Sequence, residues 1–261
     1  MPSSLDTHRE GRVLVVVNDD PKTRNALGWD FYGDFTEILG RAGADEALGA
    51  IVVTGGGGFF SSGGNVKGLR ERAGMALAKR HEGVERLHGM IRAMRDCPKP
   101  ILAAIEGGAA GAGASLALAC DMIVAAREAY LSVAYVKIGL TPDGGATAFL
   151  GAALPRQLLN EMAMTGDRVG MERLHALGIV NHLSAPGQAL EDALARAAAL
   201  AEGPPEALAQ IKRLVHAAQS APLEAQLERE AEAIAQALGG PEAREGIAAF
   251  FEKRKPAFPR D

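Results

Sequence analysis

Residues 101–121 read ILAAIEGGAAGAGASLALACD, an apolar run, a loop of small residues and a second apolar run. The first run, 101–105, has the composition of a buried strand, and the glycines of 107–113 predict a tight loop that opens a short helix over 115–120. The same order recurs around residues 51–70, where a strand over 50–54 precedes a loop with six glycines. This repeated pattern predicts an α/β fold with two glycine-rich loops after buried strands.

Outward from these loops, strands and helices alternate up to residue 143, and helices dominate beyond it. Further strands are predicted over 13–17, 122–125, 129–133 and 180–183. Helices are predicted over 29–41, 66–94 (with a break near Gly74), 154–165, 171–177, 188–201, 205–218, 223–238 and 243–253. The chain therefore has a predicted α/β core followed by a helical region.

The composition excludes several classes of protein. The chain has 261 residues, a net charge of −4 at pH 7 and only 5% aromatic residues, which argues against nucleic-acid binding. Two cysteines exclude a disulfide framework and favour reduced thiols. Residues 1–12 lack the apolar core of a signal peptide, and the apolar stretch 109–126 is too short to span a bilayer. We expect a soluble cytoplasmic protein without a membrane partner.

A glycine loop that opens a helix presents backbone N–H groups with the helix dipole behind them, so it can hold a phosphate or an oxyanion. Neither loop carries a nucleotide-binding motif, since Gly-x-x-x-x-Gly-Lys-[Ser/Thr] is absent and no Gly-x-Gly-x-x-Gly stands in the required place. Either the glycines only turn the chain, or the two loops together form a two-donor oxyanion site. The repetition of strand, loop and helix favours the second interpretation.

Four segments carry a resemblance to a known family. Residues 60–66 read FSSGGNV, 107–121 read GGAAGAGASLALACD, 18–27 contain PK and NAL, and 246–255 end in FFEKRK. In this order they resemble the signatures of the crotonase (enoyl-CoA hydratase/isomerase) superfamily. The resemblance covers nearly the whole chain.

The resemblance implies a ββα-superhelix core over residues 1–195 and a C-terminal helical trimerisation region over 196–261. It implies an acyl-CoA thioester substrate, no cofactor beyond coenzyme A as part of that substrate, and a homotrimer or dimer of trimers. The backbone N–H groups of Gly64 and Ala112 would hold the thioester oxygen. The positions that the resemblance assigns to coenzyme A are Lys22, Arg24, Gly63, Asn65, Val66 and Lys253.

The acid–base groups separate the activities within this superfamily. Ser115 and Tyr135 occupy the positions of the two glutamates that hydratases of the usual type carry. Asp143, in the segment 137–145, instead matches the single aspartate of the superfamily's isomerases, of the epoxyphenylacetyl-CoA and 3-enoyl- to 2-enoyl-CoA type. A double-bond shift needs one base and no water, and a carboxylate in an apolar pocket has a raised pKa. We therefore predict an enoyl-CoA isomerase with Asp143 as acid and base.

Two other functions stay open. The first is a hydratase, or an oxepin-CoA-type hydrolase, in which water replaces a missing glutamate. The second is a non-catalytic member that binds acyl-CoA or RNA, although the acidic balance weighs against RNA.

Several residues also have simpler structural interpretations. Asp143 stands where a helix N-cap is common, and Asp121 is interpreted as structural. His81 and His88 are predicted to share a solvated helix face, and no histidine or cysteine spacing indicates a metal site. The basic cluster is either an exposed helix face or an attraction for coenzyme A phosphates; its members are Lys67, Arg70, Arg72, Lys79 and Arg80.

Overall fold

The computed structural model describes residues 5–260 and contains a six-stranded main sheet in the order β1-β2-β3-β4-β6-β9. The strands are β1 (Leu5–Glu10), β2 (Val13–Asn18), β3 (Ala50–Gly55), β4 (Ile101–Ile105), β6 (Met122–Ala126) and β9 (His182–Ser184). Only β1 is antiparallel to its neighbour; the other pairings are parallel. Strands buried on both faces of a parallel sheet are apolar throughout, which is why β3 and β4 were predicted correctly.

A small second sheet contains β5 (Gly108–Ala110), β7 (Tyr130–Ser132) and β8 (Val169–Gly170). The expectation of a plain loop over 107–113 is thus partly wrong, because β5 pairs with β7 in the middle of it. Neither β5 nor β1 has an apolar sequence pattern of its own. The partner strand supplies the hydrogen bonds for each of them, and β1 is a largely exposed edge.

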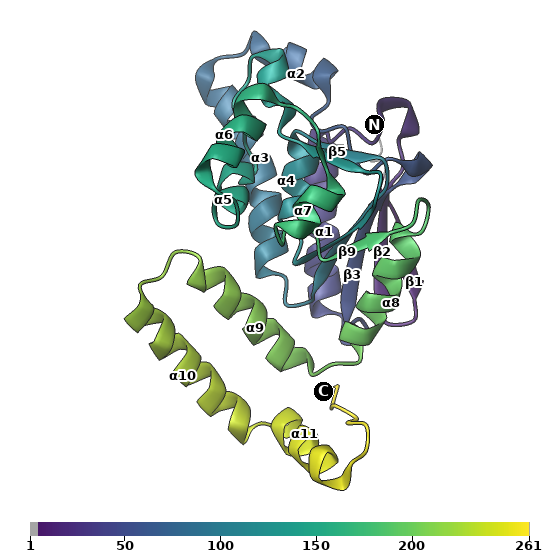
Figure 1. Cartoon of the computed structure of the whole chain (residues 1–261), viewed down its shortest axis with the longest axis vertical. Helices are drawn as coiled ribbons and strands as arrows, with labels where there is room; N and C mark the ends of the chain where they lie inside the picture. The colour runs from purple at the N-terminus through teal and green to yellow at the C-terminus, as the bar shows by residue number, and fades with distance from the viewer. Residues whose placement is uncertain (1–4, 261) are drawn as a thin grey trace.

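Helices cover both faces of the main sheet (Figure 1). On one face α8 (Ala189–Ala201) lays Ala193, Ala197 and Ala201 against alternate residues of the strands. A Cβ at Gly49 would lie 2.6 Å from the Ala201 Cα, so the glycine permits this close approach. On the other face lie α1 (Trp29–Ala44), α3 (Leu77–Asp96) and α4 (Ala112–Leu118).

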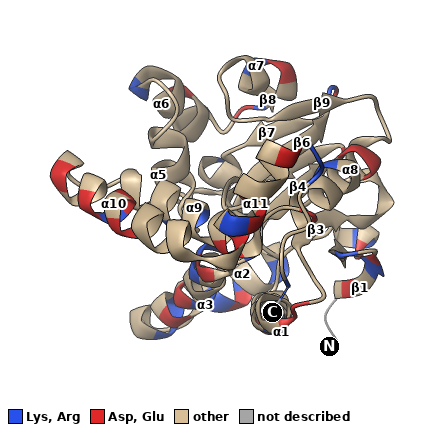
Figure 2. Cartoon of the chain, turned by 90° about the horizontal axis from the view of Figure 1, so that it is seen from below, with Lys and Arg blue, Asp and Glu red and all other residues tan. Residues whose placement is uncertain are grey.

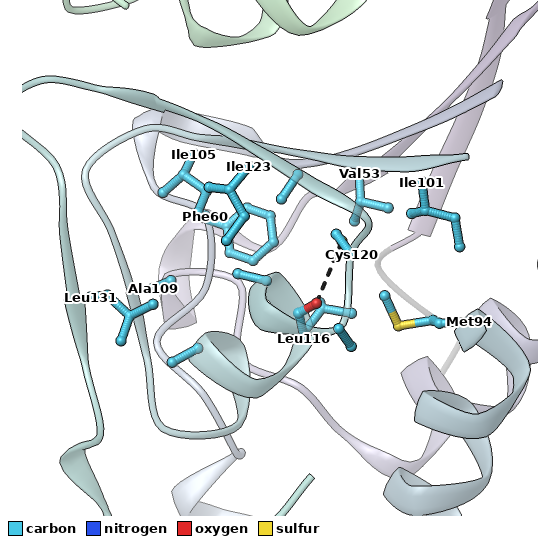
Figure 3. Packing of buried hydrophobic residues seen from close by; sticks show 14 of the residues in the cluster. Val53, Phe60, Met94, Ile101, Ile105, Ala109, Leu116, Cys120, Ile123 and Leu131 are labelled. Atoms are coloured by element: carbon cyan, nitrogen blue, oxygen red, sulfur yellow. Dashed lines mark hydrogen bonds between the residues drawn. The ribbon is translucent and has the colours of Figure 1, made fainter. Parts of the chain in front are cut away.

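The larger hydrophobic core surrounds α4 (Figure 3). Phe60, Met94 and Leu116 are almost completely buried there. Cys120 donates a weak hydrogen bond to the Leu116 carbonyl oxygen, and both it and Cys97 are free, buried thiols. Because α4 is enclosed by this core, the glycine loop that precedes it has a fixed position.

The remaining helices lie mostly in the second half of the chain. They are α2 (Val66–Ala73), α5 (Ala146–Gly151), α6 (Arg156–Thr165), α7 (Met171–Ala176), α9 (Pro205–Ala218), α10 (Leu223–Gly239) and α11 (Pro241–Glu252), with short 3-10 turns η1 (Pro21–Thr23), η2 (Gly56–Gly58) and η3 (Ala134–Ile138). The break expected near Gly74 separates α2 from α3. Helix α5 was not predicted, and α4 begins three residues before the predicted helix.

Helices α9, α10 and α11 extend away from the core as an arm (Figure 1). The arm exposes large apolar side chains, and Phe250 and Phe251 are 77% and 78% exposed. The predicted boundary between residues 195 and 196 falls inside α8, a helix that packs against the main sheet. The division into two domains stays a prediction.

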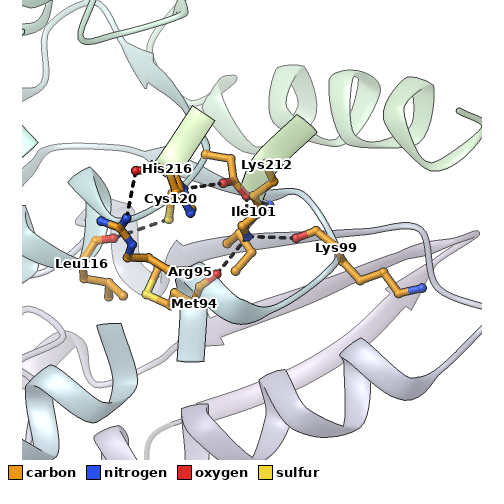
Figure 4. A network of polar contacts seen from close by, with 9 residues as sticks. Met94, Arg95, Lys99, Ile101, Leu116, Cys120, Lys212 and His216 are labelled. Carbon is orange, nitrogen blue, oxygen red and sulfur yellow. Dashed lines mark hydrogen bonds and ion pairs between the residues drawn. The ribbon is translucent and has the colours of Figure 1, made fainter. Parts of the chain in front are cut away.

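A buried polar network attaches α9 to the core (Figure 4). Lys212 Nζ lies 2.8 Å from Asp121 Oδ2 and donates hydrogen bonds to the backbone oxygens of Met94 and Lys99. The same Asp121 oxygen accepts from the Ile101 backbone N–H at 2.8 Å. These contacts agree with the structural interpretation of Asp121.

Helix α3 carries charged residues of both signs, whereas β3, β4 and β6 carry none (Figure 2). Across residues 5–260, no helix has both the length and the apolar character needed to cross a membrane. The same part of the chain contains no group of three or more side chains suited to hold a metal ion.

Candidate active site

The two glycine-rich loops lie against each other. Ser61 donates its backbone N–H to Gly108 O at 3.2 Å and accepts from Ala110 N–H at 2.9 Å. Gly63 has a φ of +97°, and a Cβ at this position would lie 2.6 Å from the Ala110 carbonyl oxygen. Only glycine fits here, because the backbone conformation and the space both exclude a side chain.

This close approach places two backbone N–H groups near each other. The same Cβ built on Gly63 would lie 3.2 Å from the backbone nitrogen of Ala112. Within residues 5–260, the N–H groups of Gly64 and Ala112 donate no hydrogen bond to the protein. Ala112 is also the first residue of α4, so its N–H has no partner within the helix. Both N–H groups are therefore available to a ligand oxygen.

Gly64 and Ala112 line a cavity of about 660 Å³ together with Val66 and Asp143. Its walls come from α1, α2, α3, the start of α4, the turn η3 and the segment that follows η3. Among the described residues, Asp143 is the single carboxylate in this lining. The structure thus brings three predicted catalytic positions to one cavity.

Asp143 is held by Ser115 and Tyr135, the two residues that the resemblance assigns to the glutamate positions. The Tyr135 hydroxyl donates a hydrogen bond to Asp143 Oδ1 at 2.8 Å. Ser115 Oγ lies 2.9 Å from the Tyr135 hydroxyl and donates to the Asp143 backbone oxygen at 2.9 Å. The N-cap hypothesis for Asp143 is wrong, because α5 begins at Ala146 with Gly145 as its cap. The side chain is instead free to act in the cavity.

Burial raises the pKa of the Asp143 carboxyl above its ordinary value, because water no longer solvates the charged form. The hydrogen bond from Tyr135 and the positive potentials of His88 and Arg72 oppose this rise. Burial also raises the pKa of the Tyr135 hydroxyl, so the tyrosine stays protonated and remains a donor. The net effect is a raised pKa of the Asp143 carboxyl, which makes its protonated form more accessible than that of an exposed aspartate.

Sequence reasoning missed part of the cavity wall. Tyr32 of α1 is buried in it, and burial together with the nearby Asp143 charge raises its pKa to about 12. His88 also lines the cavity and is half-buried, so the solvated-face hypothesis is wrong for it, whereas His81 is exposed. The i, i+7 spacing of the two histidines gave no sign that they would differ.

The residues predicted to bind coenzyme A lie at several places. Asn65 caps α2, since its Oδ1 accepts from the backbone N–H groups of Lys67 and Gly68. Lys22 and Arg24 are exposed near η1 and do not line the cavity. Lys253 ends α11, in the arm. The structure of one chain therefore does not bring these three cations to the cavity.

A protonatable carboxylate and two unpaired N–H groups at one cavity wall can bind a carbonyl oxygen and exchange a proton with the adjacent carbon. The fold and this site define an α/β protein with a candidate acid–base centre for carbonyl compounds. The chain belongs to the enoyl-CoA hydratase/isomerase family, whose model matches residues 8–261.

Relatives and solved structures agree with this membership. The chain is 37% identical to a probable enoyl-CoA hydratase of Rhodobacter capsulatus, over 94% of both chains. It is 29% identical to the 1,2-epoxyphenylacetyl-CoA isomerase of Escherichia coli, over 97% of both. The crystal structure of an enoyl-CoA hydratase from Polaromonas sp. JS666 matches with a TM-score of 0.95 and 41% identity, covering 98% of this chain and 99% of that one. The predicted crotonase-like fold is confirmed.

Proposed function

We propose that the protein is an enoyl-CoA isomerase that uses Asp143 as its single acid–base group. The observation that carries this proposal is that Asp143, the single carboxylate among the described residues of the cavity lining, is held there by hydrogen bonds from Tyr135 and Ser115. Family membership supports an acyl-CoA thioester as the substrate class, and the names of the relatives include both hydratase and isomerase.

In the proposed reaction, the thioester oxygen accepts hydrogen bonds from the N–H groups of Gly64 and Ala112. The Asp143 carboxylate removes a proton from the carbon beside the carbonyl, and the electron pair moves into the dienolate of a 3-enoyl substrate. Protonated Asp143 then returns the proton two carbons further along, which leaves a 2-enoyl thioester. Two backbone donors stabilise the dienolate oxygen, and each such donor contributes ~10²–10³ in rate.

The coenzyme A portion is the only cofactor-like group that this chemistry needs. We propose that Gly63, Asn65 and Val66 contact it beside the cavity, and that Lys22 and Arg24 attract its phosphates. We propose that Lys253, the C-cap residue of α11, reaches coenzyme A from the C-terminal end of the same chain or from a neighbouring copy.

We also propose that the arm mediates a homotrimer or a dimer of trimers. Large exposed apolar side chains are concentrated on the arm, as is typical of interaction surfaces; they include Leu227, Ile234, Leu238, Phe250 and Phe251. Light scattering of the purified protein tests this proposal. A mass of 27.2 kDa, that of one chain, would contradict it.

The experiment that tests the isomerase compares a 3-enoyl-CoA with the matching 2-enoyl-CoA. The wild type should convert the 3-enoyl substrate, and Asp143→Asn should lower that rate by ~10²–10⁴ because the proton carrier is lost. Asp192→Asn on α8, outside the cavity, is the matched control and should keep the rate. Hydration of the 2-enoyl substrate that survives in Asp143→Asn, without isomerisation in the wild type, would support the hydratase instead.

A further inference from the structure

The cavity beside Asp143 has an excess of positive charge. Arg72, Arg80 and Lys137 line it, and Asp143 is the single carboxylate among the described residues of the lining. Lys137 forms an ion pair with Asp167. Within residues 5–260, neither arginine forms an ion pair. Of the five members of the basic cluster noted in the sequence, only Arg72 and Arg80 line the cavity.

Arg72 is held in place without an acidic partner. Its Nε donates to the Gly68 backbone oxygen at 3.2 Å, and its guanidinium lies 5.6 Å from the centre of the Trp29 ring. A Cβ at Gly83 would lie 3.2 Å from Arg72 Nη1, so this glycine leaves space for the guanidinium against α3. The terminal nitrogens of this half-buried cation donate no hydrogen bond to the protein within residues 5–260. A fixed cation that is partly removed from water gains free energy from an anionic partner.

Arg72, on α2, lies against α3 at a different level from the Asp143 loop. Leu87 lies beside the Asp143 loop, because a Cβ at Gly144 would be 3.2 Å from its Cδ2. Gly83 comes one turn earlier on the same helix, about 6 Å away. Tyr32 is buried close enough to both Asp143 and Arg72 for their charges to act on its hydroxyl. The cavity thus continues from Asp143 along α3 to the guanidinium.

We propose that the acyl group of the substrate ends in a carboxylate and that Arg72 binds this carboxylate at the α3 end of the cavity. Arg80, which is exposed at the rim, attracts the same charge. This inference rests on the proposed function for the position of the thioester at Asp143. A coenzyme A phosphate is the other anion available, but Arg72 lies among groups that surround Asp143, whereas phosphates suit the exposed Lys22 and Arg24.

Calorimetric binding of unreactive thioesters tests the inference. Adipyl-CoA is compared with hexanoyl-CoA, and suberyl-CoA with octanoyl-CoA, because each pair differs only in the terminal carboxylate. The wild type should bind at least one carboxylate-ended member about 10- to 100-fold more tightly than its partner, the range of a charge-assisted hydrogen bond. Arg72→Met should abolish this preference and leave hexanoyl-CoA and octanoyl-CoA binding unchanged.

The matched control is Lys79→Met, which removes a cation of the same cluster that is outside the cavity and paired with Glu82. It should keep the preference. If the wild type binds the two members of each thioester pair with equal affinity, the inference is overturned. This outcome is measured on the wild type alone, so it does not depend on whether a variant folds. Weaker binding of every thioester and of free coenzyme A by Arg72→Met would overturn it too, by showing a phosphate contact.

The proposed function is tested separately in the same protein samples by conversion of 3-hexenoyl-CoA to 2-hexenoyl-CoA. A preference for the carboxylate without this conversion would contradict the Asp143 chemistry and support the Arg72 site. Conversion without a preference would contradict only the Arg72 site.

Discussion

The Tyr135 hydroxyl donates a hydrogen bond to Asp143 Oδ1 at 2.8 Å, and this contact connects a buried donor to the proposed base. It has two effects on the carboxylate. It orients one oxygen, so that the other remains available in the cavity, and it stabilises the charged form against the desolvation caused by burial. Tyr135 therefore has a definite role in the proposed one-base chemistry.

Tyr135→Phe should move the acid side of the pH–rate profile to higher pH. The hydrogen bond lowers the pKa of Asp143, so without it burial raises that pKa further. The deprotonated Asp143 carboxylate starts the reaction. As the pH is lowered, the variant should therefore lose activity at a higher pH than the wild type does. The measurement is kcat/KM against pH. Ser115→Ala keeps the Tyr135–Asp143 bond and should move the profile less; an unchanged acid limb in Tyr135→Phe would be contrary to this account.

Asp143→Asn should raise the melting temperature at pH 7 while it lowers activity. Burial raises the pKa of this carboxyl in the folded chain above its ordinary 3.8, so the folded state binds the proton more tightly than the unfolded state. The folded state is therefore destabilised as the pH rises from the pKa of the unfolded chain to the higher pKa of the folded chain. Asparagine has no charge to bury, and its amide oxygen still accepts from Tyr135.

Thermal unfolding followed by circular dichroism at several pH values checks this expectation. The difference in melting temperature between Asp143→Asn and wild type should shrink as the pH falls below 3.8. A lower melting temperature for the variant at pH 7 would show that the charged carboxylate stabilises the fold instead.

Gly63→Ala should cost at least about 1 kcal/mol of folding free energy, because the backbone has a positive φ and the new Cβ would meet the Ala110 oxygen. Relief of that overlap separates the two loops, so the rate should fall by up to ~10²–10³ as the N–H pair loses its geometry. Gly68→Ala in α2 is the control, since a Cβ there has open space. Urea unfolding and kcat report the two effects; a fully active Gly63→Ala would argue against the oxyanion site.

Lys212→Met should destabilise the protein by about 3 kcal/mol, because the largely buried Asp121 carboxylate would keep only the more distant His216, 3.7 Å away, as an ion-pair partner. The side chains of Lys212 and Asp121 are only 7% and 16% exposed. Glu172→Gln breaks the exposed pair with Arg127 and should change stability by less than about 1 kcal/mol. Urea unfolding compares them, and equal effects would contradict the importance of burial for the α9 attachment.

Much of the fold was predictable because its signals are local. The apolar runs of β3 and β4 and the alanine spacing of α8 are properties of short segments, and each was recognised. The edge strand β1 was not, because it is polar and exists only through its pairing with β2. Helix α5 was missed for a related reason: it has six residues, too few for a periodic pattern.

Some residues of the candidate site were likewise predictable from local motifs, and others were not. Asp143, Gly64 and Ala112 were selected from motifs, and the structure brings them to one cavity. The contributions of Tyr32 and Arg72 depend on how α1 and α2 pack against α3, and no short segment of sequence records this packing.

The sequence by itself determined the α/β class, the two glycine loops and a single candidate carboxylate, because strand composition, turn chemistry and motif order are written in neighbouring residues. Only the tertiary structure decided that Gly63 packs against the Ala110 backbone, that Tyr135 holds Asp143, and that Arg72 faces the same cavity. The physical reason is that hydrogen bonding, desolvation and charge act through space, between groups that the chain separates by eight residues for Tyr135 and Asp143 and by tens of residues for the other pairs.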